Sequence, residues 1–488
     1  MKKIFKIASA LMSLLLSLSI VFTFPVQVFA ESLPNESKTQ VEDYIDNGNE
    51  GQPFTVGNII SEDVDKRDKY SKQFRLDDGS YMAVSYNMPI HYQNGNGKWE
   101  DYDNSLVDGA DTSTATKEIN SDELANKKSN LDISYSKETK EKDMVKIKSD
   151  KYLVSWGYKN TNKVKANVVT DNEQLDGNEK YIALKKLTSE VLYENVYNNV
   201  DIQYIATTVG IKENIILKNS YAQSEFEIHY NINSLTAKQI NDKRIELYNK
   251  SNNSVYTIEA PYMTDADGKA STQLSLSIAR QENNILDVKI SADESFLKEC
   301  SYPVMIDPQF NTSQDWQESE CTYIDNSHPN TAYGYESTTG YTGTVYAGTF
   351  GQGMYRSFLK MKTLPQLNKG DMIVNATVNL HLYQNGFYDN MDVSAYYVTS
   401  NWSQSTLTWN NRPNYESNII DNERFVPNDP DAWHDWDVTT CVKRWYNGDN
   451  NNGIMLKAAD ENNVYQCASF YSSNYPSSSV PRPLFRLC

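Results

Sequence analysis

Apolar and polar residues alternate along several short segments of this chain, and this pattern restricts the fold more than any other sequence feature. One stretch carries the pattern twice, on either side of a short polar loop, with apolar positions at Leu274, Leu276, Ile278, Leu286, Val288 and Ile290. Successive side chains of a strand point to opposite faces of a sheet, so each half predicts a strand with one buried face. The two halves together predict a hairpin.

A second group of alternating positions lies nearer the C-terminus, at Val374, Ala376, Val378, Leu380 and Leu382. Residues 437–448 differ, because Val438, Cys441, Val442 and Trp445 have helical spacing there. Asp437 or Thr439 can cap the start of this short helix and Gly448 can end it. The chain also contains 34 Tyr and 8 Trp, residues that favour strands. We therefore predict an all-β protein, with a β-rich N-terminal region followed by a jelly-roll β-sandwich that contains one short helix.

The first thirty residues have the three parts of a secretory signal peptide. A basic start is followed by a nearly unbroken apolar stretch and by Ala30, a small residue suited to cleavage. Retention as a membrane anchor is the alternative, since the apolar stretch is close to the shortest length that spans a bilayer. We predict cleavage, secretion, and no membrane span afterwards. The expected divisions are a leader at 1–30, a flexible linker at 31–60, a β-rich region at 61–310 and a jelly roll at 318–488.

The formal net charge of the chain is −18. Binding to nucleic acid or to an anionic membrane needs clustered Lys and Arg, so neither partner is expected. The five cysteines are too few and too scattered for a disulfide scaffold. Cys441 with Cys467 is the pair to test first, and a fully reduced chain is the alternative.

Motifs for catalysis are scarce. The sequence contains neither a His-Glu-x-x-His motif nor a Gly-x-Ser-x-Gly elbow. Cys441 and His434 could form a nucleophile and base, but Cys441 lies on the apolar stripe of the predicted helix, which favours core packing. We therefore expect a protein that is not an enzyme.

Four acidic residues crowd one predicted loop: Asp429, Asp431, Asp435 and Asp437. Three interpretations remain open: a solvated loop, a structural calcium site built from hard oxygen ligands, or a carboxylate pair that cleaves a glycosidic bond. Calcium is the only cofactor that the sequence suggests.

Aromatic residues in polar stretches are the better functional candidates. The C–H face of a sugar ring packs on Trp or Tyr, while its hydroxyls need polar neighbours. The residues predicted to contact a glycan are Tyr333, Tyr335, Tyr341, Trp433, Tyr471 and Tyr475.

The second half of the chain resembles the DNRLRE domain, a jelly-roll module of secreted bacterial proteins that is related to carbohydrate-binding modules. The resemblance is carried by residues 355–360, 398–413, 436–445, 452–454 and 482–483. It implies that Trp402, Trp436 and Trp445 belong to the core.

The first half resembles the opening region of wall-associated and RHS-repeat proteins, long exported chains of Gram-positive bacteria. Residues 97–104, 193–202, 210–215 and 302–308 carry this resemblance. Such chains normally continue into long repeats, so this chain is expected to be either a short stand-alone version or a truncated reading frame.

These observations predict a secreted protein at the cell surface or cell wall, whose jelly roll binds polysaccharide or a cell-wall glycan. One alternative is a structural base module that binds no sugar and works with a downstream RHS-type partner. Another is a polysaccharide-degrading enzyme.

Overall fold

The structure is a computed structural model, and it describes most of the chain between residues 57 and 487. The described residues are 26–27, 57–110, 119–170 and 177–487, with gaps at 178, 183, 185, 261, 268–269, 314–318, 335–343, 369–370, 386–389, 428–431, 464 and 473–483. Nearly all regular structure in them is β-strand, which confirms the predicted fold class. The predicted leader and linker lie almost entirely outside the described residues.

The chain forms two compact units. We call residues 89–172 and 184–316 the N-terminal sandwich, and residues 1–88, 173–183 and 317–488 the C-terminal unit.

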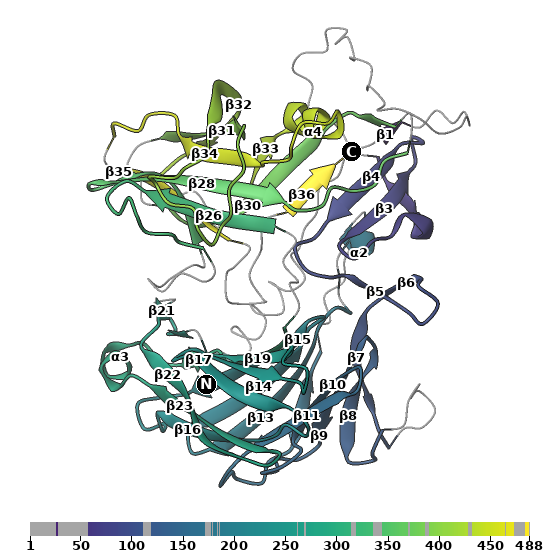
Figure 1. Cartoon of the computed structure of the whole chain (residues 1–488), viewed down its shortest axis with the longest axis vertical. Coiled ribbons are helices and arrows are strands. Elements are labelled where there is room, and N and C mark those ends of the chain that lie inside the picture. The colour runs from purple at the N-terminus through teal and green to yellow at the C-terminus, as the bar shows by residue number, and fades with distance from the viewer. Residues whose placement is uncertain are drawn as a thin grey trace. The chain divides into compact units, whose positions relative to one another are not determined.

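Two antiparallel sheets face each other in the N-terminal sandwich (Figure 1). The first has the order β22 (Leu274–Glu282), β23 (Ile285–Ala292), β16 (Glu225–Asn231), β11 (Tyr152–Tyr158), β10 (Val145–Ser149), β9 (Leu131–Ser136), β8 (Glu123–Lys128), β7 (Asp103–Asp108). The second has the order β12 (Ala166–Val169), β13 (Ser189–Tyr197), β14 (Val200–Ala206), β15 (Gly210–Leu217), β25 (Gln309–Thr312), β19 (Ser254–Glu259), β18 (Arg244–Tyr248), β17 (Thr236–Asn241). The predicted hairpin is confirmed, because β22 pairs with β23 in the register Leu276 to Ile290.

Smaller elements complete this unit. They are β5 (His91–Gln93), β6 (Trp99–Asp101), β20 (Met263–Thr264), β21 (Ala270–Ser271), β24 (Val304–Ile306) and the helix α3 (Glu294–Glu299). The core between the two sheets contains Trp156, whose ring stacks on that of Phe310 with 4.9 Å between centroids.

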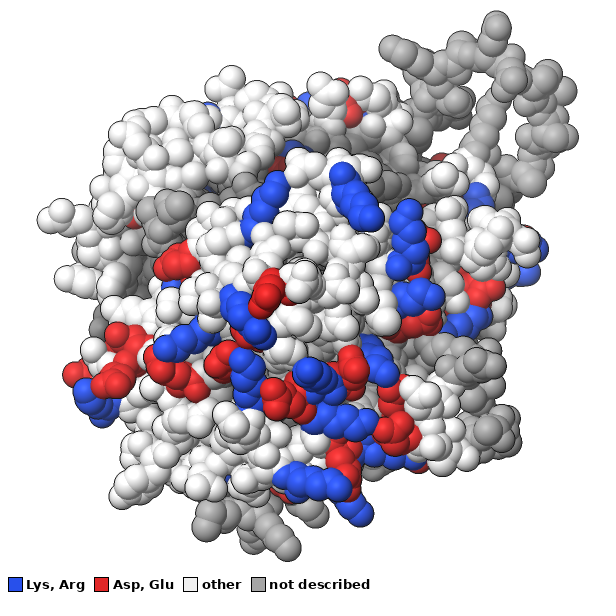
Figure 2. Space-filling model, turned by 60° about the horizontal axis from the view of Figure 1, so that its bottom comes forward, with Lys and Arg blue, Asp and Glu red and all other residues white. Residues whose placement is uncertain are grey.

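The outer face of the first sheet carries charges of both signs, as Figure 2 shows for the side of the molecule that comes forward. Phe226 and Ile228 of β16 point into the core, so Glu225, Glu227 and His229 lie on the opposite face. Asp287 of β23 receives hydrogen bonds there from Lys159 at 3.2 Å and Arg280 at 2.8 Å. Opposite charges thus meet in pairs across this surface.

The C-terminal unit is built on one 15-stranded sheet that bends around its core. The main path is β2 (Ile59–Glu62), β3 (Ser71–Leu76), β4 (Tyr81–Ser85), β36 (Leu484–Leu487), β30 (Ala376–Asn385), β35 (Tyr465–Tyr471), β27 (Thr344–Phe350), β28 (Gly353–Met361), β34 (Ile454–Ala458), β31 (Met391–Val398), β32 (Tyr415–Phe425). Beside the path lie β1 (Val26–Gln27), β26 (Ser319–Asp325), β29 (Met372–Ile373) and β33 (Trp433–Asp437). The helical segments are η1 (Val64–Lys66), α2 (Glu179–Ile182) and α4 (Thr439–Tyr446).

The predicted short helix is confirmed as α4, with Cys441, Val442 and Trp445 buried. The carboxylate of Asp437 accepts a hydrogen bond from the backbone N–H of Thr439 at 2.8 Å, and Gly448 follows the helix with a φ of +105°. The predicted strand at 374–382 begins later, at Ala376, and Val374 is 41% exposed. The face of this strand that carries polar residues is not solvated, because Asn379 and His381 are buried as well.

The structure divides the region that we predicted at 61–310. Strands β2 to β4 belong to the C-terminal unit instead, since β4 pairs with β36 in the register Ser85 to Phe485. The pairing partner lies about four hundred residues further along the chain, and local alternation does not encode such a contact.

Candidate functional site: an aromatic band in the C-terminal unit

Four tyrosines gather on neighbouring strands of the C-terminal unit, and we call them the tyrosine cluster. They are Tyr323 of β26, Tyr333, Tyr346 of β27 and Tyr355 of β28. The ring of Tyr323 stacks on Tyr333 with 4.3 Å between centroids and meets Tyr346 edge-on at 4.8 Å. Tyr323 is 8% exposed, and the other three are half-buried. The cluster therefore offers aromatic surface without belonging wholly to the core.

Asp325 provides the polar edge of this cluster. Its carboxylate accepts a hydrogen bond from the Tyr333 hydroxyl at 3.3 Å and lies 2.7 Å from Nδ1 of His328. Burial opposes ionisation of Asp325, but hydrogen bonds from Ser327 and His328 outweigh it and lower the pKa. Burial and the charge of Asp325 raise the pKa of Tyr333 to about 12. At neutral pH the edge therefore combines a carboxylate acceptor with a phenol donor.

A second aromatic group, which we call the His381 cluster, lies on three further strands. It contains His381 and Tyr383 of β30, Trp433 of β33 and Tyr471 of β35. The His381 ring lies 5.1 Å from Trp433 and 5.8 Å from Tyr471, and Tyr383 lies 5.1 Å from Tyr471. Trp433 is directly opposite His381 in the register of the two strands, and this places the rings together.

The two clusters adjoin each other. Thr344 of β27 donates a hydrogen bond to the hydroxyl of Tyr346 at 2.8 Å, and the register places Thr344 opposite Tyr471 of the His381 cluster. Burial raises the pKa of Tyr346, and the neighbouring Tyr383 adds to this rise. We call the two clusters together the aromatic band.

The structure brings together three of the six residues predicted to contact a glycan. Tyr333 lies in the tyrosine cluster, and Trp433 and Tyr471 lie in the His381 cluster. Tyr335, Tyr341 and Tyr475 lie outside the described residues.

Five members of the band were missed by the sequence analysis: Tyr323, Tyr346, Tyr355, His381 and Tyr383. The predicted residues were chosen because they stand in polar sequence, whereas these five stand in strands that also carry apolar residues. Their position at alternate residues, as for Tyr323 and Asp325 of β26, was a usable signal.

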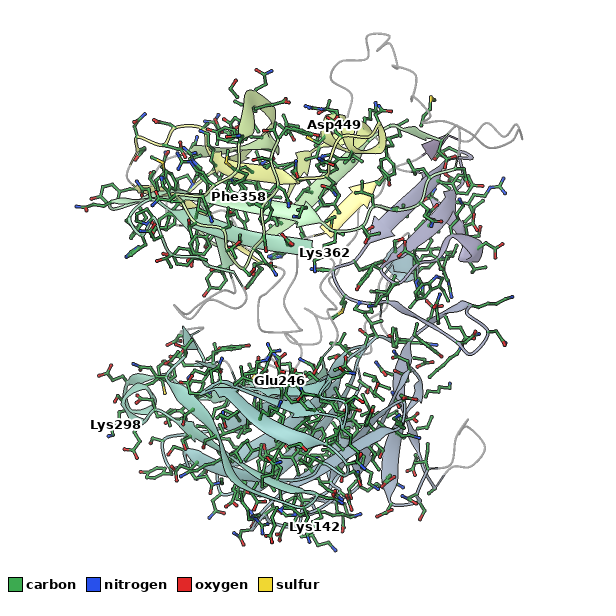
Figure 3. The ribbon with its side chains drawn as sticks, in the orientation of Figure 1. Lys142, Glu246, Lys298, Phe358, Lys362 and Asp449 are labelled. Carbon is green, nitrogen blue, oxygen red and sulfur yellow. The ribbon has the colours of Figure 1, made fainter. Side chains whose placement is uncertain are left out.

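Other tryptophans of this unit are structural. Trp402, Trp436 and Trp445 are buried as the resemblance implied. Phe358, labelled in Figure 3, packs edge-on against Trp402 with 5.7 Å between centroids. The half-buried Trp409 has the guanidinium groups of Arg356 and Arg412 over its ring, at 5.0 and 4.9 Å.

The cysteines show no disulfide in the described part of the chain. Cys441 and Cys467 are both free, so the pair that we chose to test first does not form. Burial raises the pKa of each thiol to about 12. His434 lies 3.0 Å from Glu423, and Cys441 belongs to the core, in agreement with packing rather than nucleophilic catalysis.

Two of the four acidic residues proposed as calcium ligands are described, and both make hydrogen bonds on β33. Asp435 accepts a hydrogen bond from Asn379, and Asp437 accepts one from the start of α4. Asp429 and Asp431 lie outside the described residues. Within the described ranges no group of three or more His, Cys, Asp or Glu side chains is placed to hold a metal ion.

Calcium therefore stays a prediction, which a thermal melt can test. A ligand that binds only the folded chain raises the melting temperature by mass action. Added calcium should raise the melting temperature of the protein, and Asp435→Asn should reduce this rise. A melting temperature that changes with neither calcium nor chelator would contradict the predicted calcium site.

Comparison with known proteins supports the assignment of the C-terminal part. The model of carbohydrate-binding module family 96 matches residues 312–480, a range that contains the whole aromatic band. This match agrees with our prediction of a module of the carbohydrate-binding type. It does not confirm the name DNRLRE.

Relatives match nearly the whole chain at low identity. The tRNA nuclease WapA of Bacillus subtilis (strain 168) is 24% identical over 96% of this chain. The tRNA3(Ser)-specific nuclease WapA of Bacillus spizizenii is 25% identical over 87% of it. The chain covers only 20% and 18% of the lengths of these two proteins.

These names contradict our prediction that the protein is not an enzyme, since the relatives are named nucleases. The prediction came from missing motifs, and motif searches detect only the few catalytic arrangements that have a fixed spacing. The expectation that the chain does not bind nucleic acid came from its charge alone and stays a prediction. Among the described residues, none of the helices has the length and apolar character needed to cross a membrane.

Proposed function

We propose that this protein is an exported component of the cell surface or wall, and that its C-terminal unit binds glycan through the aromatic band. The observation that carries the proposal is the coincidence of two findings. The family match to a carbohydrate-binding module covers residues 312–480, and the half-exposed aromatic residues gather within that range.

The chemistry of the band suits sugar. Pyranose rings present C–H faces that pack on aromatic rings, and Tyr333, Tyr355 and Trp433 are half-buried rings of this kind. Sugar hydroxyls need polar groups within reach. The buried Asp325 carboxylate accepts the hydrogen of the Tyr333 hydroxyl, so the lone pairs of that half-buried hydroxyl stay available to accept a hydrogen bond from a sugar. The band thus combines apolar ring faces with a hydroxyl acceptor, which are the two kinds of group that sugar binding needs.

Export is inferred from the sequence of residues 1–30. The basic start, the apolar stretch and Ala30 have the pattern of a secretory leader. Similarity to the WapA relatives extends over both units of this chain, so both units correspond to parts of those proteins. A glycan-binding unit on an exported chain would hold it at a polysaccharide surface.

The proposal is tested by binding of the full mature chain to a glycan array and to purified cell-wall polysaccharide. We expect retention on at least one polysaccharide, with loss of retention in the presence of soluble sugar. Trp433→Ala should weaken retention, and Tyr221→Ala should not, because Tyr221 is 86% exposed and belongs to the other unit. A chain that binds no glycan at millimolar sugar would contradict the proposal.

Cleavage of tRNA is the second candidate function, favoured only by the names of the relatives. The chain covers a fifth or less of those proteins, so their activity can reside in parts that this chain does not match. Incubating the purified chain with tRNA tests this second function. Cleavage products would support nuclease activity of this chain, and intact tRNA would contradict it.

A further inference from the structure

We propose that two glutamines, Gln239 and Gln281, seal one side of the N-terminal sandwich and keep its edge strands from pairing with strands of a second copy of this chain. This inference concerns the unit that does not carry the aromatic band, and it is independent of the proposed function. It rests on the hydrogen bonds that the two side chains make to the backbones of β22 and β17.

Strands β22 and β17 are edge strands of the two facing sheets of the sandwich, and they lie side by side (Figure 1). Facing sheets are about 10 Å apart, whereas paired strands are about 4.8 Å apart, so two such edges do not form a regular ladder with each other. An edge strand presents a row of backbone N–H and C=O groups that a further strand can bind. The alternating apolar residues Leu274, Leu276 and Ile278 make β22 well suited to such pairing.

Gln239 of β17 supplies hydrogen-bond partners to the edge of β22. Its amide nitrogen donates to the carbonyl of Leu276 at 2.9 Å, and its amide oxygen accepts from the N–H of Ile278 at 3.0 Å. A primary amide carries a donor and an acceptor as a peptide group does, so this side chain takes the place of a neighbouring strand. The carbonyl of Asp242, in the turn between β17 and β18, accepts the N–H of Leu276 at 2.7 Å.

Gln281 of β22 makes the reciprocal contact to β17. The nitrogen and oxygen of an amide are distinguished by the groups that they meet. The nitrogen of Gln281 donates to the carbonyl of Ala237 at 3.0 Å, and its oxygen accepts from the N–H of Ala237 at 3.2 Å. Each edge strand thus contributes one glutamine that covers part of the other edge.

The seal lies at the surface, where a second copy would otherwise reach the strands. Gln239 and Gln281 are both exposed, and Ile240 of β17 is 48% exposed. In the turn between β17 and β18, Nζ of Lys243 donates a further hydrogen bond to the carbonyl of Leu274. An exposed strand edge with apolar residues is a template for pairing between molecules. We therefore expect β17 and β22 to pair with strands of a second copy once the two amides are withdrawn.

Shortening both side chains by one methylene tests the seal, because the variant Gln239→Asn/Gln281→Asn keeps the amides but draws them back from their partners. In the full mature chain, deuterium exchange at the N–H groups of Ile278 and Ala237 should become about two- to tenfold faster. The N–H of Leu276 is an internal control, since its bond to the backbone of the turn remains in the variant.

Sedimentation velocity of the same variant tests the role in self-association. At concentrations where the wild type does not associate, the double variant should form dimers or larger species. Adding Ile240→Lys should restore the sedimentation of the wild type, because a charge on an edge strand opposes pairing. Gln273→Asn is the matched control, since it shortens an exposed glutamine beside β22 and leaves both bridges in place.

Three results would overturn the proposal. Unchanged exchange at both N–H groups would show that the amides do not cover the edges. Faster exchange with the sedimentation of the wild type would show that the opened edges attract no second copy. Association that Ile240→Lys does not reverse, or a loss of β-structure in the circular dichroism of the double variant, would attribute the association to unfolding. Glycan binding by the C-terminal unit is tested separately and is unaffected by these outcomes.

Discussion

Replacing Asp307 by alanine should destabilise the N-terminal sandwich by about 3–5 kcal/mol, because it removes a buried carboxylate that forms an ion pair with a buried lysine. Asp307 is fully buried and Lys212 is 4% exposed, with 3.3 Å between Nζ and Oδ2. The hydroxyl of Tyr262 donates a further hydrogen bond to the same carboxylate. Burial raises the pKa of Asp307, and Lys212 acts against this rise. The pair joins two of the segments on which the RHS resemblance rests.

Urea unfolding of the mature chain measures this effect. The transition of the N-terminal sandwich should shift in Asp307→Ala, and the transition of the C-terminal unit should stay in place as an internal control. The double variant Asp307→Leu/Lys212→Met should recover most of the loss, since apolar residues of similar volume can replace a buried ion pair at little cost. Equal stability of Asp307→Ala and the wild type would show that the pair does not contribute.

Replacing Glu213 by glutamine should stabilise the same unit above pH 7 by up to about 3 kcal/mol and have little effect below pH 4.5. Glu213 is buried on β15 and accepts a hydrogen bond from the Tyr158 hydroxyl at 2.8 Å. Burial raises its pKa from 4.5 to about 7. The folded chain therefore binds more protons than the unfolded chain between these values, so stability falls as the pH rises from 4.5 to 7 and stays lower above it.

The measurement is the free energy of unfolding at several pH values for both proteins. The difference between Glu213→Gln and the wild type should grow across the window from pH 4.5 to 7. Glu225→Gln is a suitable control, because Glu225 is solvent-exposed on the same unit. A difference that is constant with pH would show that Glu213 does not titrate in this range.

Local periodicity accounts for the parts of the fold that could be predicted. The β22–β23 hairpin and helix α4 appear where alternate or helical spacing placed them, since each buries one face that its own sequence specifies. The joining of β4 to β36 could not be predicted, because it depends on pairing between distant segments.

The candidate site was predictable only in part, for the same reason. Trp433 and Tyr471 were found because they stand in polar sequence. His381 was not found, although it lies between them, since its neighbours come from β33 and β35 rather than from its own strand. A band that crosses strands has no contiguous signature in the sequence.

Radical footprinting with and without a soluble oligosaccharide that binds the mature chain tests the glycan site most directly, because hydroxyl radicals oxidise accessible Tyr and Trp side chains. If glycan binds at the aromatic band, the sugar should protect Tyr333, Tyr355, Trp433 and Tyr471, while oxidation of Tyr221, which is 86% exposed, should be unchanged. Unchanged oxidation of all four band residues, with protection elsewhere on the chain, would contradict it.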